Sequence, residues 1–239
     1  MKLLTKVQLS IPQKCLYLDN RQMRVSFFHA IGVSDIELDR LLSDGWRKFG
    51  IYYFRPHCQD CGKCIPVRVP VDTFHMSKSQ RRLWRANSDV RMQFEYDAPF
   101  DELYKIYKEH SLNRFDTVAS KTEFEYNFFI KSCRSGYTLY YLDGVLVAAG
   151  FLDLSSQALS SVYFIYLTEI LPRGPGIYSI LREIRLAADL GLKYYYLGYY
   201  VPGNSKMQYK AGFMPFEYYH WKRQCWEIVE SREDREKLT

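Results

Sequence analysis

The sequence contains no hydrophobic stretch long enough to cross a bilayer. Its longest apolar run, Val145 to Leu152, is bounded by Asp143 and Asp153, whereas a transmembrane helix needs roughly 20 apolar residues. The N-terminal segment has Lys6 and Gln8 where a secretory signal peptide requires an unbroken apolar stretch. These absences predict a cytoplasmic protein that has no membrane partner.

Low-complexity tracts are also missing, which argues against a disordered chain. Hydrophobic residues make up 47% of the 239 positions, enough to bury one large or two small cores. Because no export signal accompanies the six cysteines, we expect thiols or metal ligands rather than disulfides.

Tyrosine and positive charge are what the sequence has in excess. The 21 tyrosines suit either a ligand that stacks and accepts hydrogen bonds or a tyrosine-rich core, and composition does not separate the two. The net charge is +6, and the segment from Lys78 to Arg91, with five basic residues against Asp89, supplies +4 of it. The charge is therefore a patch, as in proteins that bind nucleic acid.

The order of the predicted elements indicates an α+β fold with a mixed sheet. Asp143-Gly144 is a strong hairpin signal between two strands. In the first part of the chain the patterns predict strands at 22–30, 67–71 and 91–96, an extended segment at 46–54, and helices at 34–45, 77–86, 100–110 and 122–131. In the second part they predict strands at 137–142, 145–154, 159–166, 192–200 and 217–229, and helices at 177–190 and 205–211. A boundary near residue 97 would divide the chain into a region 1–97 and a region 98–239.

A loop that reads Arg173-Gly-Pro-Gly176 leads into the predicted helix at 177–190. Glycines allow backbone N–H groups to approach an anion at a helix N-terminus, although a simple turn would look the same. The order of elements around this loop resembles the GCN5-related N-acetyltransferase fold, whose acyl-CoA loop ends in a small residue. Here Tyr178 takes that position, and we expect it to crowd the pyrophosphate of CoA.

Three cysteines, Cys58, Cys61 and Cys64, recur at three-residue intervals. Thiols at this spacing can converge on one metal, with Cys15 or His57 as a fourth ligand. The spacing suits zinc and an iron–sulfur cluster equally well. Three reduced cysteines packed in a loop remain the alternative.

The basic segment predicts a binding surface for RNA. On a helix, Lys78, Arg81, Arg82 and Arg85 fall at positions i, i+3, i+4 and i+7 and share one face, while Leu83 and Trp84 point elsewhere. Such a face matches the phosphates of an RNA backbone. A solvated helix face without a ligand is the alternative, but no interleaved carboxylates neutralise this one.

Tyrosines lie in the predicted strand at 192–200, and two lysines and a further tyrosine follow it. This tract, from Tyr194 to Pro215, lies at the C-terminal edge of the strand, where open α/β sheets bind ligands.

Taken together, several segments resemble the arginyl/leucyl-tRNA–protein transferase family, and its bacterial branch most closely. The matching segments are Pro12–Gln22, Gly45–Arg47, Tyr53–Arg68, Ser77–Arg82 with Arg85 and Asn87, Tyr178–Ile184, Tyr196–Tyr200 and Lys206–Lys210. Their order and spacing cover most of the chain. Such enzymes use an acetyltransferase-like fold without acyl-CoA.

The resemblance implies transfer of leucine from Leu-tRNA to the N-terminal Asp or Glu of a protein, which marks that protein for degradation. Arginine from Arg-tRNA is the eukaryotic alternative. The partners implied are aminoacyl-tRNA and acidic acceptor proteins, not DNA. The chemistry requires no cofactor, although eukaryotic relatives bind an iron–sulfur cluster through cysteines. Cys15 and Cys64 match two of those positions, whereas Leu18 and Ile65 replace the others.

An aminoacyl ester is already activated, so the acceptor amine can attack it directly once both are held together. We expect the Tyr199 and Tyr209 hydroxyls to donate hydrogen bonds around the ester carbonyl and Lys206 to complete the catalytic group. Lys210, with Arg173 and Tyr178 of the glycine loop, is expected to bind substrate. Lys78, Arg81, Arg82 and Arg85 are expected to bind the acceptor stem of tRNA.

Two other functions fit parts of the sequence. An acyl-CoA-dependent N-acyltransferase would share the fold. A non-catalytic RNA-binding protein with a structural metal would account for the basic helix and the cysteines, but it leaves the tyrosine–lysine tract without a role.

Overall fold

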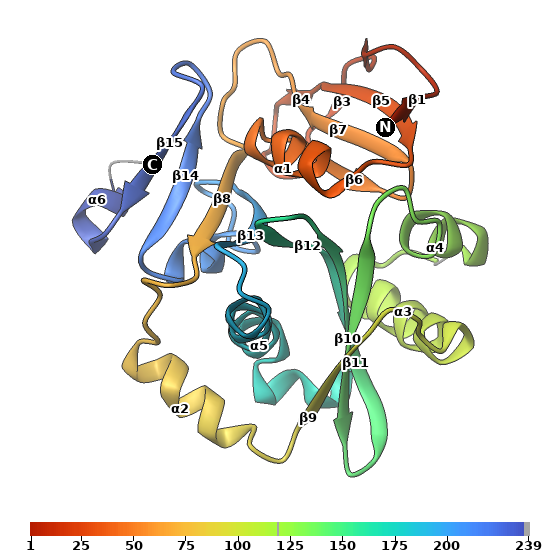
Figure 1. Ribbon diagram of the computed structural model, residues 1–239, viewed down its shortest axis with the longest axis vertical. Coiled ribbons are helices and arrows are strands. Elements are labelled where there is room, and N and C mark those ends of the chain that lie inside the picture. The colour runs from red at the N-terminus through yellow and green to blue at the C-terminus, as the bar shows by residue number, and fades with distance from the viewer. Residues whose placement is uncertain (119, 237–239) are drawn as a thin grey trace.

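The computed structural model describes residues 1–118 and 120–236 (Figure 1). An eight-stranded mixed sheet runs through it in the order β15-β14-β8-β13-β12-β11-β10-β9. Its strands are β8 (Ile65–Pro70), β9 (Arg91–Glu95), β10 (Ser135–Leu142), β11 (Val145–Leu154), β12 (Ala158–Tyr166), β13 (Tyr194–Tyr200), β14 (Phe216–His220) and β15 (Cys225–Val229). Of these neighbours, β12 and β13 are parallel and the rest antiparallel.

The centre of this sheet confirms the predicted α+β fold class and hairpin. Asp143 and Gly144 have φ angles of 49° and 80°, the left-handed values that a tight two-residue hairpin turn requires. After β12, the chain passes through helix α5 (Pro175–Asp189) and returns as the parallel strand β13. Antiparallel strands followed by a helical crossover form the acetyltransferase-like arrangement that the sequence predicted.

Helices cover both faces of the large sheet. Because side chains alternate along a strand, Leu139 of β10 packs with α3 (Phe100–Phe115) and α4 (Lys121–Phe128), whereas Tyr140 packs toward α5. Helix α2 (Lys78–Ala86) lies beside α5 (Figure 1). A short helix α6 (Arg232–Glu236) ends the described chain, and no described helix is long and apolar enough to cross a membrane.

A smaller sheet forms the N-terminal part. It contains β1 (Lys2–Leu3), β2 (Gln8–Leu9), β5 (Val25–Ile31), β6 (Arg47–Phe49) and β7 (Tyr52–Pro56), with a separate pair β3 (Gln13–Lys14) and β4 (Gln22–Met23). Helix α1 (Asp35–Ser43) follows β5, where a helix was predicted, and begins with a capping box of Ser34 and Glu37. Strands β8 and β9 come before residue 97 yet belong to the large sheet, so the proposed boundary there stays a prediction.

Two 3-10 helices flank the region where β12 and β13 meet. The first, η1 (Thr168–Arg173), leads into α5, and the second, η2 (Gln208–Gly212), follows β13. The helix predicted at 205–211 is thus a shorter 3-10 helix that begins three residues later. Both short helices contribute to the site described next.

Candidate active site

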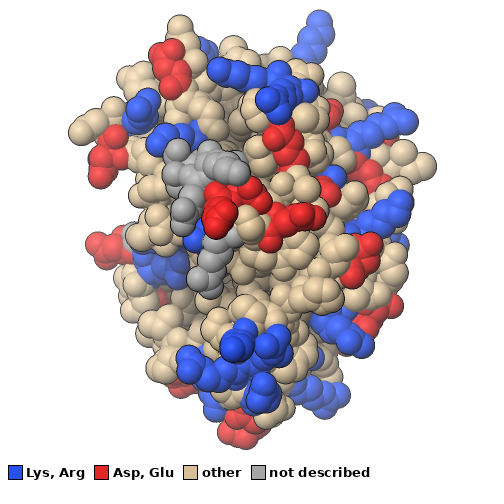
Figure 2. Space-filling view, turned by 90° about the vertical axis from the view of Figure 1, so that its left-hand side faces the viewer, with Lys and Arg blue, Asp and Glu red and all other residues tan. Residues whose placement is uncertain are grey.

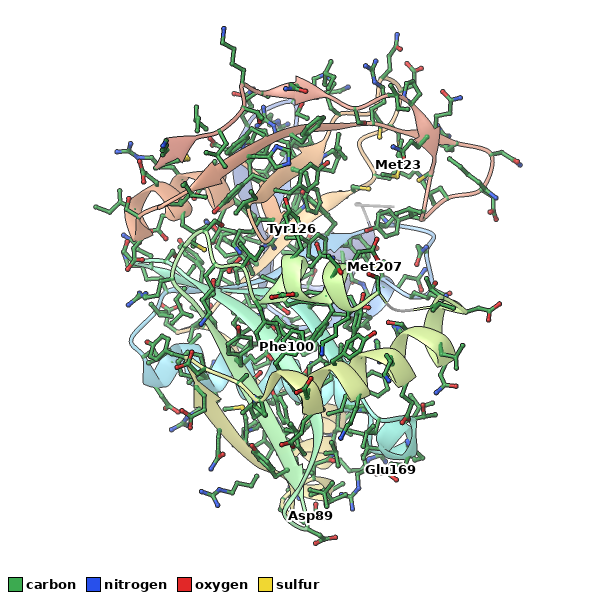
Figure 3. All side chains as sticks on the ribbon, turned by 90° about the vertical axis from the view of Figure 1, so that its right-hand side faces the viewer. Met23, Asp89, Phe100, Tyr126, Glu169 and Met207 are labelled. Carbon is green, nitrogen blue, oxygen red and sulfur yellow. The ribbon has the colours of Figure 1, made fainter. Side chains whose placement is uncertain are left out.

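A cavity of about 760 Å³ opens where β12 and β13 separate. The two parallel strands pair only from Ala158 to Ser160, opposite Tyr194 to Tyr196. Beyond that point their diverging ends, the start of α5, the segment around η2, and residues of α1 and β6 line the cavity. Met207, one of the lining residues, lies in the view of Figure 3 between the N-terminal sheet and α3. The site therefore draws on segments from both halves of the sequence.

The charged residues that line the cavity are mostly positive. Five are cations and one is a carboxylate: Arg47, Lys48, Arg114, Lys206 and Lys210 against Asp153. Asp153 is already paired, because Lys48 Nζ lies 3.0 Å from its Oδ1 and both side chains are almost fully buried. Such an excess of cations fits a ligand that carries negative charge.

Arg47 of β6 reaches the cavity from the smaller sheet. Its Nη1 donates a hydrogen bond of 2.7 Å to Ser160 Oγ, and its guanidinium lies 5.2 Å from the ring centre of Tyr196. Nη2 is buried and has no hydrogen-bond partner within residues 1–118 and 120–236. An unpaired buried donor costs roughly 1–3 kcal/mol, and more when it is charged, so this atom is suited to an acceptor supplied by a ligand.

Lys210 of η2 brings a second cation close to Arg47. Burial, and then the neighbouring Arg47 charge, lower the pKa of Lys210 to about 7. Its Nζ lies 3.1 Å from where a Cβ of residue 198 would stand, so glycine at that position leaves room for the ammonium group. No hydrogen bond or ion pair holds this Nζ in the part of the chain that the structure describes.

The predicted residues Tyr199, Tyr209, Lys206 and Lys210 all line this cavity. Tyr199 is buried and donates its hydroxyl proton to Gly45 O at 2.9 Å, so it offers a ligand its lone pairs rather than its proton. Tyr209 is 38% exposed, and burial of the rest of the ring raises the pKa of its hydroxyl. The catalytic roles of these residues stay predictions.

Arg173 and Tyr178 do not line the cavity. The Arg173 guanidinium forms two hydrogen bonds of 2.9 Å with the Asp89 carboxylate. The Tyr178 hydroxyl donates to Asn87 O at 3.0 Å, and its ring lies beside Trp84. Tyr178 therefore does not crowd the glycine loop as expected, because its ring is packed under α2. Both side chains tie α2 to α5, and their substrate-binding role stays a prediction.

The basic face predicted for α2 is present. Lys78, Arg81, Arg82 and Arg85 are all exposed, while Leu83 and Trp84 are half-buried. Figure 2 shows blue side chains gathered at the lower end of the molecule, where α2 lies. The helix is anchored by Gln80, whose amide donates to Gly212 O at 3.1 Å. Binding of RNA by this face stays a prediction.

The cysteine loop lies between β7 and β8. Burial, and then the nearby Cys58, Cys15 and Cys61, raise the pKa of the Cys64 thiol to about 12. The four thiols are thus neighbours, but the described residues contain no group of three or more Cys, His, Asp or Glu placed to hold a metal. As placed, these side chains do not fit zinc or a cluster, and we derive no chemical step through one.

Sequence reasoning missed Arg47, Lys48, Asp153 and His110 as lining residues. Arg47 lies within the Gly45–Arg47 segment, which indicated a resemblance to the family but no role for this residue in a site. Burial and the nearby Arg114 charge lower the pKa of His110 to about 4, so its imidazole is neutral. These residues come from separate elements, and no spacing in the sequence indicates that they meet.

Comparison with known proteins identifies the family. Residues 13–82 match arginine-tRNA-protein transferase, N terminus, and residues 101–220 match arginine-tRNA-protein transferase, C terminus. The chain is 35% identical over 221 residues to the aspartate/glutamate leucyltransferase of Acinetobacter baumannii (strain AYE), covering 86% of this chain and 78% of the relative. It is 34% identical over 211 residues to that of Stutzerimonas stutzeri (strain A1501), covering 86% and 90%.

A solved structure, the GCN5-related N-acetyltransferase from Kribbella flavida, is similar with a TM-score of 0.38 and 14% identity, over 69% of this chain and 54% of that one. The family matches and the identities to curated relatives are what decide the assignment. The chain belongs to the arginine-tRNA–protein transferase family.

Proposed function

We propose that this protein transfers leucine from Leu-tRNA to the α-amine of proteins that begin with Asp or Glu. The curated relatives carry the name aspartate/glutamate leucyltransferase. The observation that carries the proposal is the cavity between β12 and β13, with five cations against one paired carboxylate. An RNA end and an acidic acceptor are both negatively charged, so this cavity suits both substrates.

The charge of the cavity favours leucine over arginine as the donated residue. A guanidinium in the cavity would need a carboxylate, and the one lining carboxylate, Asp153, is paired with Lys48. Apolar side chains from α1 and β12 line the same space and suit an isobutyl group: Leu38, Leu41, Leu42 and Val162. This difference supports Leu-tRNA as the donor.

The reaction needs positioning more than a reactive side chain. The α-amine of the acceptor, whose unperturbed pKa is about 7.7–8.0, is partly neutral near pH 7. It attacks the ester carbonyl, a C–N bond forms, the C–O bond to ribose breaks, and the proton that the amine loses is balanced by one gained at the ribose oxygen. Lys206 and Tyr209 line the cavity, and we expect them to stabilise the oxyanion.

Helix α2 is the proposed surface for the tRNA stem. Arg173 and Tyr178, bonded to Asp89 and Asn87, fix this helix beside the start of α5, whose first residues line the cavity. A stem bound along the four α2 cations would therefore direct its 3′ end toward the cavity. Because none of the four is buried, their contribution should weaken as salt rises.

Two observations speak against an acyl-CoA substrate. Pro175 is the first residue of α5 and has no N–H to offer a pyrophosphate. Leu83 of α2 packs over Gly174, with its Cδ1 3.1 Å from where a Cβ of residue 174 would stand. A non-catalytic RNA-binding protein would not require the cationic cavity. The six free cysteines also suit a reducing compartment, which supports the cytoplasm.

The test is incubation with radiolabelled Leu-tRNA or Arg-tRNA and peptides that begin with Asp, Glu or Lys. We expect label from Leu-tRNA on the Asp and Glu peptides. Alanine at Lys78, Arg81, Arg82 and Arg85 together should raise the KM for Leu-tRNA and flatten its salt dependence. The control removes four exposed cations outside α2: Lys2, Lys6, Lys105 and Lys193. Absence of transfer from Leu-tRNA, with binding of CoA, would overturn the proposal.

A further inference from the structure

We infer that Arg47 and Lys210 together bind the side-chain carboxylate of the acceptor's first residue and so select proteins that begin with Asp or Glu. The inference rests on the proposed function and deepens it. The two residues come from β6 and η2, which lie far apart in the sequence, and both line the same cavity. Neither residue forms an ion pair among the described residues, although the Asp153 carboxylate is near enough to act on the Arg47 charge.

The Arg47 guanidinium is held in one orientation before any ligand binds. Ser160 accepts from Nη1 at 2.7 Å, and the Tyr196 ring lies against the guanidinium plane. These contacts leave the buried Nη2 without a partner. Arg47 is only 8% exposed, and a buried donor without an acceptor is costly. A ligand oxygen at Nη2 would complete this hydrogen-bond set.

Within the part of the chain that the structure describes, no carboxylate forms a hydrogen bond with Arg47 Nη2 or Lys210 Nζ. Asp153 forms its ion pair with Lys48, at 3.0 Å. Glu183 of α5 is buried and accepts hydrogen bonds from Tyr195, Thr138 and Tyr140. The remaining lining cations, Arg114 and Lys206, are exposed. Arg47 is buried and Lys210 half-buried, so this pair is the shielded positive charge of the cavity that a ligand must neutralise.

Burial separates this pair from the cations suited to tRNA. The phosphates of a tRNA end are bulky and hydrated, and the exposed cations of α2, Arg114 and Lys206 can reach them from solvent. A single carboxylate is small enough to enter the cavity and can accept from Arg47 Nη2 and Lys210 Nζ at once. The donor's own α-amino group is a cation, so the pair would repel it. An acidic acceptor side chain is small, carries negative charge and can accept two hydrogen bonds, so it suits this pair.

The test uses the full-length enzyme and peptides that begin with Asp or with its amide isostere Asn. Lys210→Met should lower kcat/KM for the Asp peptide by roughly 30-fold or more, as expected for loss of one partner of a buried charge pair. The Asn peptide should be affected much less, because an amide makes no ion pair. Both its rate of transfer and its equilibrium binding should change by less than about 3-fold. The KM for Leu-tRNA should stay unchanged, and Lys210→Arg should restore most of the preference for Asp.

Arg47→Met should give the same loss of preference, and Arg47→Lys should retain part of it. Lys193→Met, at an exposed lysine just before β13, is the matched control and should keep the wild-type preference. In the ligand-free enzyme, Lys210→Met should keep or raise the melting temperature, because it removes a buried charge without a partner.

Two results would overturn the inference while the proposed function stands. The first is an equal loss for Asp and Asn peptides in the folded Lys210→Met variant. The second is a raised KM for Leu-tRNA with an unchanged preference for Asp, which would place an RNA phosphate at the pair. Absence of any leucine transfer by the wild-type enzyme is a different result, and it overturns the proposed function.

Discussion

Glu183 of α5 is a buried carboxylate that should make the stability of the protein depend on pH. It accepts hydrogen bonds from Tyr195 at 2.5 Å, Thr138 at 2.9 Å and Tyr140 at 3.4 Å. Burial dominates these bonds and raises the pKa of Glu183 from 4.5 to about 7. Below pH 4.5 the group is protonated in both folded and unfolded chains. Between pH 4.5 and 7 the folded chain binds more protons than the unfolded chain, so stability falls as the pH rises.

The size of this effect follows from the shift of the pKa. Raising it from 4.5 to about 7 corresponds to about 3 kcal/mol at 1.36 kcal/mol for each pH unit. Glu183→Gln keeps the shape and removes the titration. Its free energy of unfolding relative to wild type should therefore increase by about 2–3 kcal/mol between pH 5 and pH 8. Urea unfolding at both pH values measures this difference.

Glu102→Gln, at an exposed position of α3, is the control for loss of one negative charge. The comparison of interest is between the pH dependences of the two variants, because other groups titrate in the same range. If the difference between Glu183→Gln and wild type is the same at pH 5 and pH 8, the carboxyl group does not titrate as its burial requires, and the reasoning is wrong.

Three further changes test the structure. Lys48→Met leaves Asp153 as an unpaired buried charge and should lower the free energy of unfolding by roughly 3–5 kcal/mol in chemical denaturation; a loss below about 1 kcal/mol would contradict the buried pair. Gly150→Ala would place a Cβ 2.3 Å from a Glu183 carboxylate oxygen, and a calorimetric loss of roughly 1–3 kcal/mol is expected. Ser77→Ala removes the N-cap of α2 and should lower the free energy of unfolding by about 1 kcal/mol. An unchanged melting temperature would contradict this role of Ser77.

The local elements were predictable because their signals are local. Asp143-Gly144 adopts the turn its residue types favour, and the helices predicted from residues 34 and 77 begin there, with Ser34 and Ser77 as N-caps. The basic face of α2 follows from helical spacing alone. The predicted Tyr199 and Lys210 also reach the cavity, because the tract that holds them follows one strand.

The rest of the site could not be read from the sequence because it depends on long-range packing. Arg47 bonds to Ser160, 113 positions away, and Lys48 pairs with Asp153. Tyr178 was expected to face a ligand, but its hydroxyl bonds to Asn87 O, which only the docking of α2 reveals. Hydrophobic pattern and turn chemistry do not specify which distant polar groups meet.

The pairing between β12 and β13, in the middle of the large sheet, is short. Only Ala158 to Ser160 align with Tyr194 to Tyr196, so the four strands on one side are joined to the four on the other by three residue pairs. Strand β8 continues the sheet beyond β13, and β11 continues it beyond β12. A substrate seated in the opening touches both parts and bridges the β12/β13 junction. A bound substrate would therefore restrict motion between the two parts of the sheet. Binding and the rigidity of the sheet are thus linked through the β12/β13 junction.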